Sequence, residues 1–499
     1  MPDFNPTTND KVSREFNQVR RFWQHPLLER TLLHYDVASS MAHVRMLGKT
    51  GIVDAGNAEQ VVGALEQIGR ELADGVNFIS PDDADIHEGL ERRLNEIVGE
   101  MAAVLRIAKS TNDQDATDVR LWLRDAVYEV FQALLQIRTQ LIELATRDLD
   151  VVMPGYTHMQ PALPILLSHW WLANEARFRR DFERLSEFYR RLNVLPLGAC
   201  VLAGTPEPID RAMVAQELGF DDVIENSVDA VSDRDFVIEF SAVASLIGVH
   251  LSQMSSELLL WATQEFGFVK LPKRFVFDSQ AMPSKRNPEL LEVLRARPST
   301  LFGRLMEHLT QLKAIPLGYS QDLQESLPGL FQSAEILRQL LDLASVLIPN
   351  IEIDANRMRE MACADMLNAA NAKNYLVSRD IPEDKSDKVV EALTNYCKAR
   401  GKYLSDLSLS EWQQFSPAFE NDIYQVVTME NSVASFCSFG GSSKDQVEFA
   451  LTRAQEKLSG DQERLPLFKP RIAGVGSGAD DELGVTHGGA RKQKGAGAK

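Results

Sequence analysis

Two long intervals without glycine or proline constrain the fold of this sequence more than any other feature. The first runs from Glu100 to Met153 and the second from Ile165 to Leu195. Because both residue types interrupt helices, intervals of this length favour long helices. In the first interval apolar residues recur at steps of three and four, the period of one helix face. These apolar residues are Val119, Leu123, Val127, Val130, Leu134, Ile137, Leu141 and Leu144.

The first interval predicts a single helix that starts near Ala116 and runs for more than about 30 residues, or about 50 Å. A helix of this length is typical of a bundle, a coiled coil or a repeat, and the sequence has no internal repeat. Further long helices are predicted at 235–266, 289–312 and 329–347, and runs that alternate as strands do are few and short. The sequence therefore predicts an all-α fold with a long central helical bundle.

The predicted bundle has smaller helical regions on both sides. We expect an N-terminal helical domain at 1–107, the bundle at 108–355 and a C-terminal helical domain at 356–470. The Gly-rich remainder, 471–499, has no periodicity and is expected to be disordered. Because the longest helix exceeds what one compact domain needs, we also expect several chains to associate into a larger bundle.

Composition excludes several classes of function. The formal net charge of −18 argues against a nucleic-acid partner, which needs a basic face. No run of about 18 apolar residues is present, and the N-terminus has no apolar signal region, so neither a membrane span nor secretion is expected. The four cysteines lack the spacing of a zinc site or a disulfide framework, which favours reduced thiols in the cytoplasm.

Four polar stretches interrupt the predicted helices. They are KSTNDQDATD (109–118), MPGYTHMQPALP (153–164), SVDAVSDRDF (227–236) and DSQAMPSKRNPELLE (278–292). Each also has a purely structural interpretation. Ser110 and Asp113 could cap the helix that follows, a lone His158 is more often structural than catalytic, and Pro288 is favourable in the first turn of a helix, with Asn287 as its cap. The stretch SDRDF could be a surface ion pair and a cap.

Taken together, the four stretches indicate chemistry. They combine hydroxyl and amide groups with lysine and arginine, and no metal-ligand spacing or phosphate-binding loop competes with them. Such groups suit a site that holds carboxylates and a developing carbanion without a metal, as β-elimination from a dicarboxylic acid requires. The residues concerned are Ser279, Lys285, His158, Asn112, Asn287, Thr157 and Arg234.

The same stretches resemble the signature regions of the fumarase/aspartase superfamily, and most closely those of argininosuccinate lyase. DSQAMPSKRNP resembles the family pattern GSSxMPxKxNP, GYTHMQ resembles GYTHxQ, and STNDQDATDVRLW resembles SxNDQxATDxRLW. DAVSDRDF matches the family letter for letter, and LGACVLAGTPEPIDR, DIHEGLERRL and YSQDLQE resemble three further stretches. The resemblance extends from about residue 15 to about residue 470.

The resemblance implies a three-domain fumarase/aspartase-type fold and a homotetramer whose active sites are each shared by three subunits. It implies reversible elimination of fumarate from an N-substituted aspartate, with no metal or organic cofactor. Ser279 would be the general base, Lys285 and Asn287 would hold the aci-carboxylate intermediate, His158 would protonate the leaving nitrogen, and Glu292 would keep that histidine basic. The residues implied in substrate binding are Ser110, Thr111, Asn112, Thr157, Arg234, Asn287, Tyr319 and Gln324.

Several positions depart from the family pattern. Thr111 stands where argininosuccinate lyases have the arginine of SRND, and Leu327 replaces a late lysine. Asp278 and Gln280 replace a glycine and a second serine beside Ser279, His25 falls where the family has a serine, and 381–390 lacks the usual PFRxAH. Two nearby cations, Arg106 and Lys109, are candidates to replace the missing arginine.

These departures affect substrate recognition and spare the elimination machinery. Three hypotheses therefore stay open. They are argininosuccinate lyase itself, a carbon–nitrogen lyase for a different N-succinyl-type adduct such as an aminocarboxylic acid or diamine succinate, and a non-catalytic, crystallin-like protein.

Overall fold

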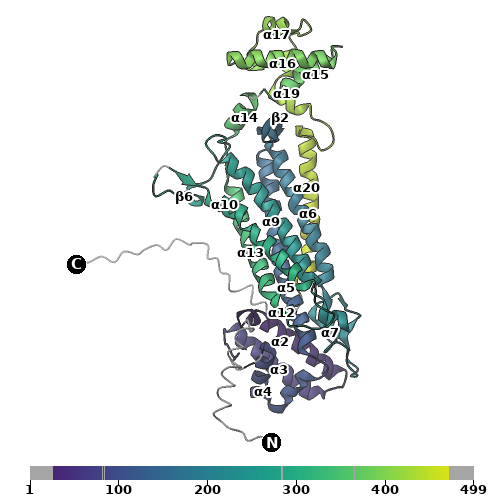
Figure 1. Cartoon of the computed structure of the whole chain (residues 1–499). Coiled ribbons are helices and arrows are strands. Elements are labelled where there is room, and N and C mark those ends of the chain that lie inside the picture. The colour runs from purple at the N-terminus through teal and green to yellow at the C-terminus, as the bar shows by residue number, and fades with distance from the viewer. Residues whose placement is uncertain (1–25, 81–82, 84, 283–284, 365, 471–499) are drawn as a thin grey trace, which may run out of the picture.

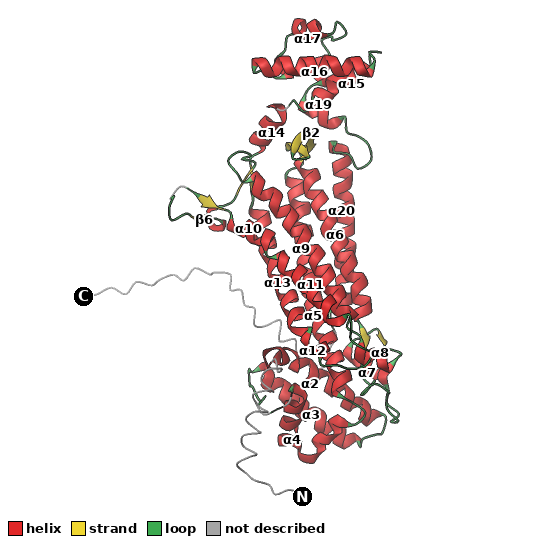
Figure 2. Cartoon of the chain, viewed as in Figure 1, coloured by secondary structure: helices red, strands yellow, loops and turns green. Residues whose placement is uncertain are grey.

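The computed structural model describes residues 26–80, 83, 85–282, 285–364 and 366–470. Helices make up most of this part of the chain, and its strands are short and occur in pairs (Figure 2). The predicted all-α fold is therefore confirmed. The predicted disordered tail and His25 lie outside the described residues.

Five long helices run side by side and form the central bundle (Figure 1). They are α5 (Thr111–Arg147), α6 (Leu167–Leu192), α9 (Asp235–Trp261), α13 (Leu327–Leu347) and α20 (Lys444–Phe468). Helix α5 contacts α6, α13 and α20, and α6 packs against α9. All residues of the apolar stripe predicted from Val119 to Leu144 are buried. The period of the sequence therefore identified the face of α5 that the bundle covers.

Helix α5 has 37 residues and is therefore about 55 Å long. It begins at Thr111 because Ser110 and Asp113 form a capping box. The Ser110 Oγ accepts a hydrogen bond from the Asn112 N–H at 3.4 Å, and the Asp113 Oδ1 accepts one from the Ser110 N–H at 3.0 Å. Ser110 and Asp113 therefore cap α5, as their purely structural interpretation predicts.

The helix predicted at 289–312 is wrong in one respect, because the structure divides it into α10 (Glu289–Ala296) and α11 (Pro298–Leu312). Pro298 has no N–H to donate, and its ring clashes with the carbonyl four residues earlier, so a new helix starts there. A Cβ added to Gly248 of α9 would lie 3.0 Å from the Pro298 Cβ, so the two helices approach closely at this point.

Within the described residues, α9 meets the length and composition of a membrane-crossing helix, with a mean hydropathy of 1.4 over its most apolar window. Of that window, 56% is buried inside the fold. Helix α9 packs against α6, α10, α11 and α13. A core helix of a bundle meets the same criterion, and these contacts place α9 in the core.

Shorter helices lie at the two ends of the bundle (Figure 1). Near the start of α5 lie α2 (Pro26–Lys49), α3 (Ala55–Ala73), α4 (Ile86–Val98), η1 (Gly99–Arg106), α7 (Arg211–Leu218), α8 (Ser227–Ser232) and α12 (Asp322–Glu325). Toward the other end lie α14 (Ala355–Ala364), α15 (Ala369–Val377), α16 (Glu383–Arg400), α17 (Leu409–Phe415), α18 (Ile423–Val426) and α19 (Met429–Ala434). A second hydrophobic core, which includes Trp412 and Phe419, forms among α15 to α18.

The described strands form four two-stranded pairs. These are β1 (Val152–Thr157) with β2 (Gln160–Leu166), β3 (Val194–Leu195) with β4 (Asp222–Val223), β5 (Val269–Lys270) with β8 (Glu352–Ile353), and β6 (Phe277–Asp278) with β7 (Arg286–Asn287). Short 3₁₀ turns complete the described elements: η2 (Lys273–Phe275), η3 (Ile348–Asn350) and η4 (Leu404–Asp406). Two of the pairs, β1–β2 and β6–β7, present candidate site residues.

A buried ion-pair network ties α5 to two other bundle helices. The Arg138 side chain is fully buried, and its Nε lies 2.9 Å from Glu175 Oε1 on α6. Its Nη1 lies 2.8 Å from Asp461 Oδ2 on α20. Glu175 and Asp461 each have a second, longer contact, with Arg179 at 3.9 Å and Arg464 at 3.3 Å. Removal of Arg138 would therefore take from both buried carboxylates the cation that lies nearest to them.

We expect Arg138→Ala to lower the free energy of unfolding by about 3–5 kcal/mol, the usual cost of breaking a buried pair. Chemical denaturation measures the change. The control is Arg338→Ala on α13, because Arg338 forms partly exposed ion pairs with Glu335 and Asp342, and pairs of this kind contribute about 0–1 kcal/mol. Equal losses in the two variants would contradict the role given to Arg138.

Candidate active site

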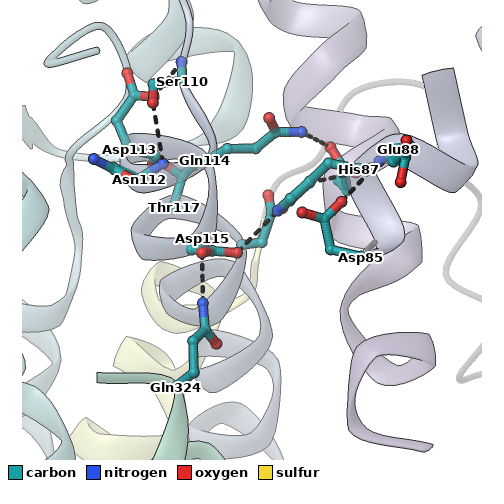
Figure 3. Close-up of polar contacts among 12 residues, drawn as sticks. Asp85, His87, Glu88, Ser110, Asn112, Asp113, Gln114, Asp115, Thr117 and Gln324 are labelled. Atoms are coloured by element: carbon teal, nitrogen blue, oxygen red, sulfur yellow. Dashed lines mark hydrogen bonds and ion pairs between the residues drawn. The ribbon is translucent and has the colours of Figure 1, made fainter. Parts of the chain in front are cut away.

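His87 belongs to α4, which lies at the lower end of the molecule in Figure 1, and it lies between two carboxylates; Figure 3 shows its contact with Asp115. It belongs to the first turn of α4, which starts after the cap residue Asp85. Its Nδ1 lies 2.9 Å from Asp36 Oδ2 on α2, and its Nε2 lies 2.9 Å from Asp115 Oδ1 on α5. Gln114 also donates to Asp36. Both ring nitrogens therefore face acceptors, so the ring must carry a proton on each to satisfy both contacts.

The charges of this network set its protonation. Burial alone would lower the pKa of His87, but Asp36 and Asp115 on its two sides raise it well above the ordinary value. Burial would raise the pKa of Asp36, and the adjacent His87 outweighs burial and lowers it. Burial raises the pKa of Asp118 well above its usual range, and the charge of Asp36 adds to this rise. His87 and Asp36 thus form a buried ion pair, and Asp118 beside it accepts a hydrogen bond from the Ser39 hydroxyl at 2.8 Å.

Asp36, His87 and Asp118 have the side-chain spacing of a metal site, because one ligand atom from each lies within 4.8 Å of the others. A histidine that binds a metal must offer a ring lone pair. His87 instead uses both nitrogens as donors to carboxylates. We therefore interpret these three residues as an ion-pair network.

Tyr319 and Gln324, two predicted substrate-binding residues, meet at the same network. The Tyr319 hydroxyl donates to Asp115 Oδ2 at 2.9 Å, and Gln324 Nε2 lies 2.5 Å from the same oxygen. Gln324 Nε2 also lies 2.9 Å from the Tyr319 hydroxyl oxygen. The loop before Tyr319 is held by the Gly318 N–H, which donates to Ser232 Oγ at 2.6 Å. Gly318 has φ +105, a conformation that favours glycine.

Arg234, the residue directly before α9, is a buried cation. It is 4% exposed, and its Nη1 donates to the Asp233 carbonyl at 2.8 Å. Its Nε is buried without a hydrogen-bond partner. Burial lowers its pKa, and the charges of Asp115 and Asp233 oppose that change. The position of Arg234 near the substrate therefore stays a prediction, and its charge interaction with Asp115 is in keeping with it.

The start of α5 carries the remaining predicted binding residues of this end. Asn112 Nδ2 donates to the Val201 carbonyl at 2.9 Å, and Thr111 is exposed at the first helical position. Of the two cations considered as replacements for the missing arginine, Lys109 lies in the network, with its Nζ donating to Ser40 Oγ at 2.9 Å. Arg106 instead pairs with Glu91 at 2.7 Å and is 75% exposed.

Asp113 fixes the start of α5 to a neighbouring loop. Its Oδ2 accepts hydrogen bonds from the Gly198 and Cys200 N–H groups, both at 2.8 Å. Burial raises the pKa of Asp113 to about 6, although three backbone N–H groups oppose the rise. The motif residue Asp113 therefore has a positioning role at the helix start.

His158 lies at the opposite end of the bundle, at the tip of the β1–β2 hairpin. Thr157 ends β1 and pairs with Gln160, so His158 and Met159 form a two-residue turn. Both have positive φ values, 52 and 60, which is typical of a type I′ hairpin turn. Thr157 and His158 are exposed. The hairpin therefore presents a hydroxyl and an imidazole at the end of the bundle.

Ser279 and Lys285 face each other across the second hairpin, β6–β7. The Ser279 N–H donates to the Lys285 carbonyl at 3.2 Å, and the Ser279 Oγ accepts a hydrogen bond from the Met282 N–H at 3.2 Å. Asp278 and Arg286, the next pair along the ladder, form an ion pair at 2.9 Å. The hairpin stands out from the side of the bundle (Figure 1). The structure thus brings the predicted base and the predicted lysine together within one loop.

Glu292 is exposed on α10, just after this hairpin. Helix α10 packs against α9, α11 and α13, whereas the β1–β2 hairpin packs against α14 and α19. Among the described residues no ion pair joins His158 with Glu292. The predicted His158–Glu292 pair is therefore not formed within the single chain described here.

The candidate residues fall into three groups within one chain (Figure 1). The binding residues around Asp115 lie at the start of α5, and the His158 hairpin follows the end of the same helix. The length of α5 separates these two groups by about 55 Å. The Ser279 hairpin stands beside the bundle between them. One chain therefore presents all the predicted residues but does not assemble them into one site.

His87, Asp36 and Asp115 were not predicted as site residues. The sequence signals were the stretch DIHEGLERRL, which contains His87, and the position of Asp115 within the NDQDATD motif. Neither signal identifies the contact, because the three residues come from different helices.

We expect His87→Gln to lower the free energy of unfolding by about 3–5 kcal/mol near pH 6, because Asp36 and Asp115 would lose the cation between them. The folded-state pKa of His87 lies above its ordinary value of 6.5. Its stabilisation is therefore fully present below that value and is lost as the pH rises through the raised pKa. Urea denaturation at several pH values should show the difference from wild type shrinking toward alkaline pH.

The control for this experiment is His169→Gln, because burial lowers the pKa of His169. Its effect should not shrink toward alkaline pH. A His87→Gln effect that stays constant from neutral to alkaline pH would contradict the charged state assigned to His87.

Comparisons with known proteins identify the family of this chain. The family model described as "Lyase" matches residues 7–303, and the model described as "Argininosuccinate lyase C-terminal" matches residues 366–434. A protein of Synechococcus sp. (strain JA-3-3Ab) named argininosuccinate lyase is 43% identical, over 88% of this chain and 90% of its own length. A protein of the same name from Syntrophotalea carbinolica is 41% identical, over 86% and 94% of the two chains.

Solved structures show the same fold. EDDS lyase in complex with formate has a TM-score of 0.80 and 26% identity, with 91% of each chain covered. A class II fumarase from Schistosoma mansoni, at 15% identity, matches in fold with a TM-score of 0.68, over 81% of this chain and 91% of its own. The family models and the curated relatives together show that the chain belongs to the argininosuccinate lyase family, fumarate-releasing carbon–nitrogen lyases of the fumarase/aspartase superfamily.

Proposed function

We propose that this chain catalyses the reversible β-elimination of fumarate from an N-substituted aspartate, either argininosuccinate or a related amine–succinate adduct. The observation that carries the proposal is the β6–β7 hairpin, which holds Ser279 opposite Lys285 through the 3.2 Å hydrogen bond between their backbones. The proposed base Ser279, the cation of Lys285 and the helix that carries Glu292 thus come from one continuous stretch, 278–292.

Ser279 acts as the general base in this proposal. A serine hydroxyl is a weak base, so its alkoxide must be stabilised before it can accept a carbon-bound proton. The Met282 N–H, which donates to the Ser279 Oγ at 3.2 Å, supplies one such stabilising contact. The cation of Lys285, on the facing side of the hairpin, supplies a second.

The elimination then proceeds in two proton transfers. Ser279 takes the β-proton, and the electron pair moves into the adjacent carboxylate to give an aci-carboxylate dianion held by Lys285 and Asn287. The carbon–nitrogen bond breaks, its electron pair leaves with the nitrogen, and His158 protonates that nitrogen. Glu292 pairs with His158 and favours its charged form. Thr157, Asn112, Thr111 and Arg234 bind the substrate, and Ser110 contributes by capping α5 beside them.

The proposal requires an assembly of several chains. The separation of about 55 Å between the two ends of α5 supports sites built from different copies, because no bend in this helix brings its ends together. An exposed apolar stripe on α11 supports the same conclusion: Phe302, Met306 and Leu309 are 45%, 60% and 40% exposed at steps of four and three. We propose a homotetramer with each site shared by three subunits. The four free cysteines are consistent with a cytoplasmic location.

A different N-succinyl-type adduct is the second candidate substrate. We call the end of the site at the start of α5, where Asp115 lies, the leaving-group end. Two residues there favour this candidate: Thr111 offers no positive charge, and Leu327 is a buried apolar residue, 6% exposed. A non-catalytic, crystallin-like role is the remaining alternative. It is disfavoured by the polar contacts that hold Ser279 opposite Lys285.

We expect purified wild-type protein to release fumarate from argininosuccinate, or to consume fumarate in the presence of an amine, as followed by ultraviolet absorbance. Ser279→Ala should lower kcat by about 10²–10⁴-fold, the usual contribution of a positioned base. Ser252→Ala is the control, because Ser252 bonds to the Arg295 carbonyl on α10, away from the hairpin. If no adduct is cleaved or formed in a Ser279-dependent way, the enzymatic proposal is wrong and the crystallin-like alternative is favoured.

Met306→Glu should split the assembly into smaller species and abolish activity, because it places a charge in the apolar stripe of α11. Light scattering after size-exclusion chromatography measures the mass. Lys398→Glu on α16 is the control for a charge change at an exposed position outside the bundle. Full activity in a monomeric Met306→Glu protein would contradict the shared-site proposal.

A further inference from the structure

Asp115 occupies the hydrogen-bond donors that were predicted to bind substrate. Its Oδ2 accepts from the Tyr319 hydroxyl at 2.9 Å and lies 2.5 Å from Gln324 Nε2, and its Oδ1 lies 2.9 Å from His87 Nε2. The chain's own carboxylate therefore has three donors (Figure 3 shows His87 and Gln324). This is how a bound carboxylic acid would be held, with two neutral donors and one cation.

The surrounding charges show what this contact does to the leaving-group end of the site. Arg234 is a buried cation; burial lowers its pKa, and the negative charge of Asp115 opposes that change. Leu327, three residues after Gln324, brings no charge, and Thr111 is an uncharged residue at the start of α5. Asp115 therefore places a negative charge at the donors that a carboxylate on the departing amine would need.

A second carboxylate at Tyr319 and Gln324 would meet Asp115 at contact distance. Like charges that close disfavour each other strongly when partly buried. The donors would also have to release Asp115, which would leave its carboxylate with His87 as its remaining partner. A leaving amine without a carboxylate avoids both costs.

We propose that Asp115 is a specificity-determining residue that selects leaving amines without a carboxylate, such as guanidines and diamines. The inference rests on the proposed function and names the class of amine that the site accepts. Asp115 belongs to the leaving-group end of the site and takes no part in the two proton transfers assigned to Ser279 and His158.

The test uses pairs of amines that differ only in a carboxylate. Arginine is compared with agmatine, its decarboxylated form, and ornithine with 1,4-diaminobutane. Each amine is incubated with fumarate and the full-length protein, fumarate loss is followed by absorbance, and the adduct is identified by mass spectrometry. We expect wild type to favour the amine without a carboxylate by about tenfold or more in kcat/KM.

Asp115→Asn keeps the shape of the side chain and removes its charge, and Asp115→Ala also frees Tyr319 and Gln324. Both changes should shift the kcat/KM ratio toward the carboxylate-bearing amine by about tenfold or more. Both amines are measured on the same preparation, so the ratio does not depend on how much of a variant folds. The matched control is Asp125→Asn, because Asp125 is also on α5 and accepts a tyrosine hydroxyl, that of Tyr35, at 2.6 Å. Its ratio should equal that of wild type.

Three results would overturn the inference. One is a wild type that prefers the carboxylate-bearing member of the pairs, a comparison that does not depend on any variant. Another is an active Asp115 variant with an unchanged ratio, and the third is an equal shift in Asp125→Asn. If fumarate is consumed with neither member of any pair and argininosuccinate is not cleaved, the proposed function itself is contradicted.

Discussion

The arrangement of this protein depends on the straight, uninterrupted run of α5. Its 37 residues contain no glycine or proline, so the helix has no point at which it can fold back. The Asp115 network lies at its start and the His158 hairpin follows its end. Burial of its stripe against three other helices, with Arg138 paired to Glu175 and Asp461, fixes that separation. The chain can therefore present these two groups but cannot bring them together by itself.

The sequence predicted helices well where one face of the helix packs into the bundle. Burial of one face alone produces apolar residues at a period of 3.6, which can be read from the sequence. It failed at Pro298, where the pattern continues on both sides and only the missing N–H marks the break. It also did not predict the two hairpins as paired strands. The turn at His158 and Met159 has left-handed φ values without the Asn-Gly pair that usually signals such a turn. The domain boundaries at 107, 355 and 470 stay a prediction.

The candidate site shows the same division between local and long-range information. Ser279 and Lys285 lie in one motif, so their closeness follows from a short loop and could be expected from the sequence. The capping contact of Ser110 with Asp113 is equally local. His87 contacts Asp36 and Asp115 across separations of 51 and 28 residues, and Gln324 reaches Asp115 across 209. Such contacts depend on how α2, α4, α5 and α12 pack, and a single histidine in a sequence gives no sign of its partners.

Under the proposed function, elimination and recognition are carried by different parts of the chain. The proton-transfer groups stand on two hairpins, where short loops position them with few buried contacts. The leaving-group end is a buried network in which His87 lies between Asp36 and Asp115, and it lies about 55 Å along α5 from the His158 hairpin. A change at this end of the site, such as the leucine at 327 in place of the family's lysine, can therefore change which amine is accepted while the hairpins keep their geometry. This separation explains how the motifs of the elimination machinery persist in a chain whose recognition residues depart from the family pattern.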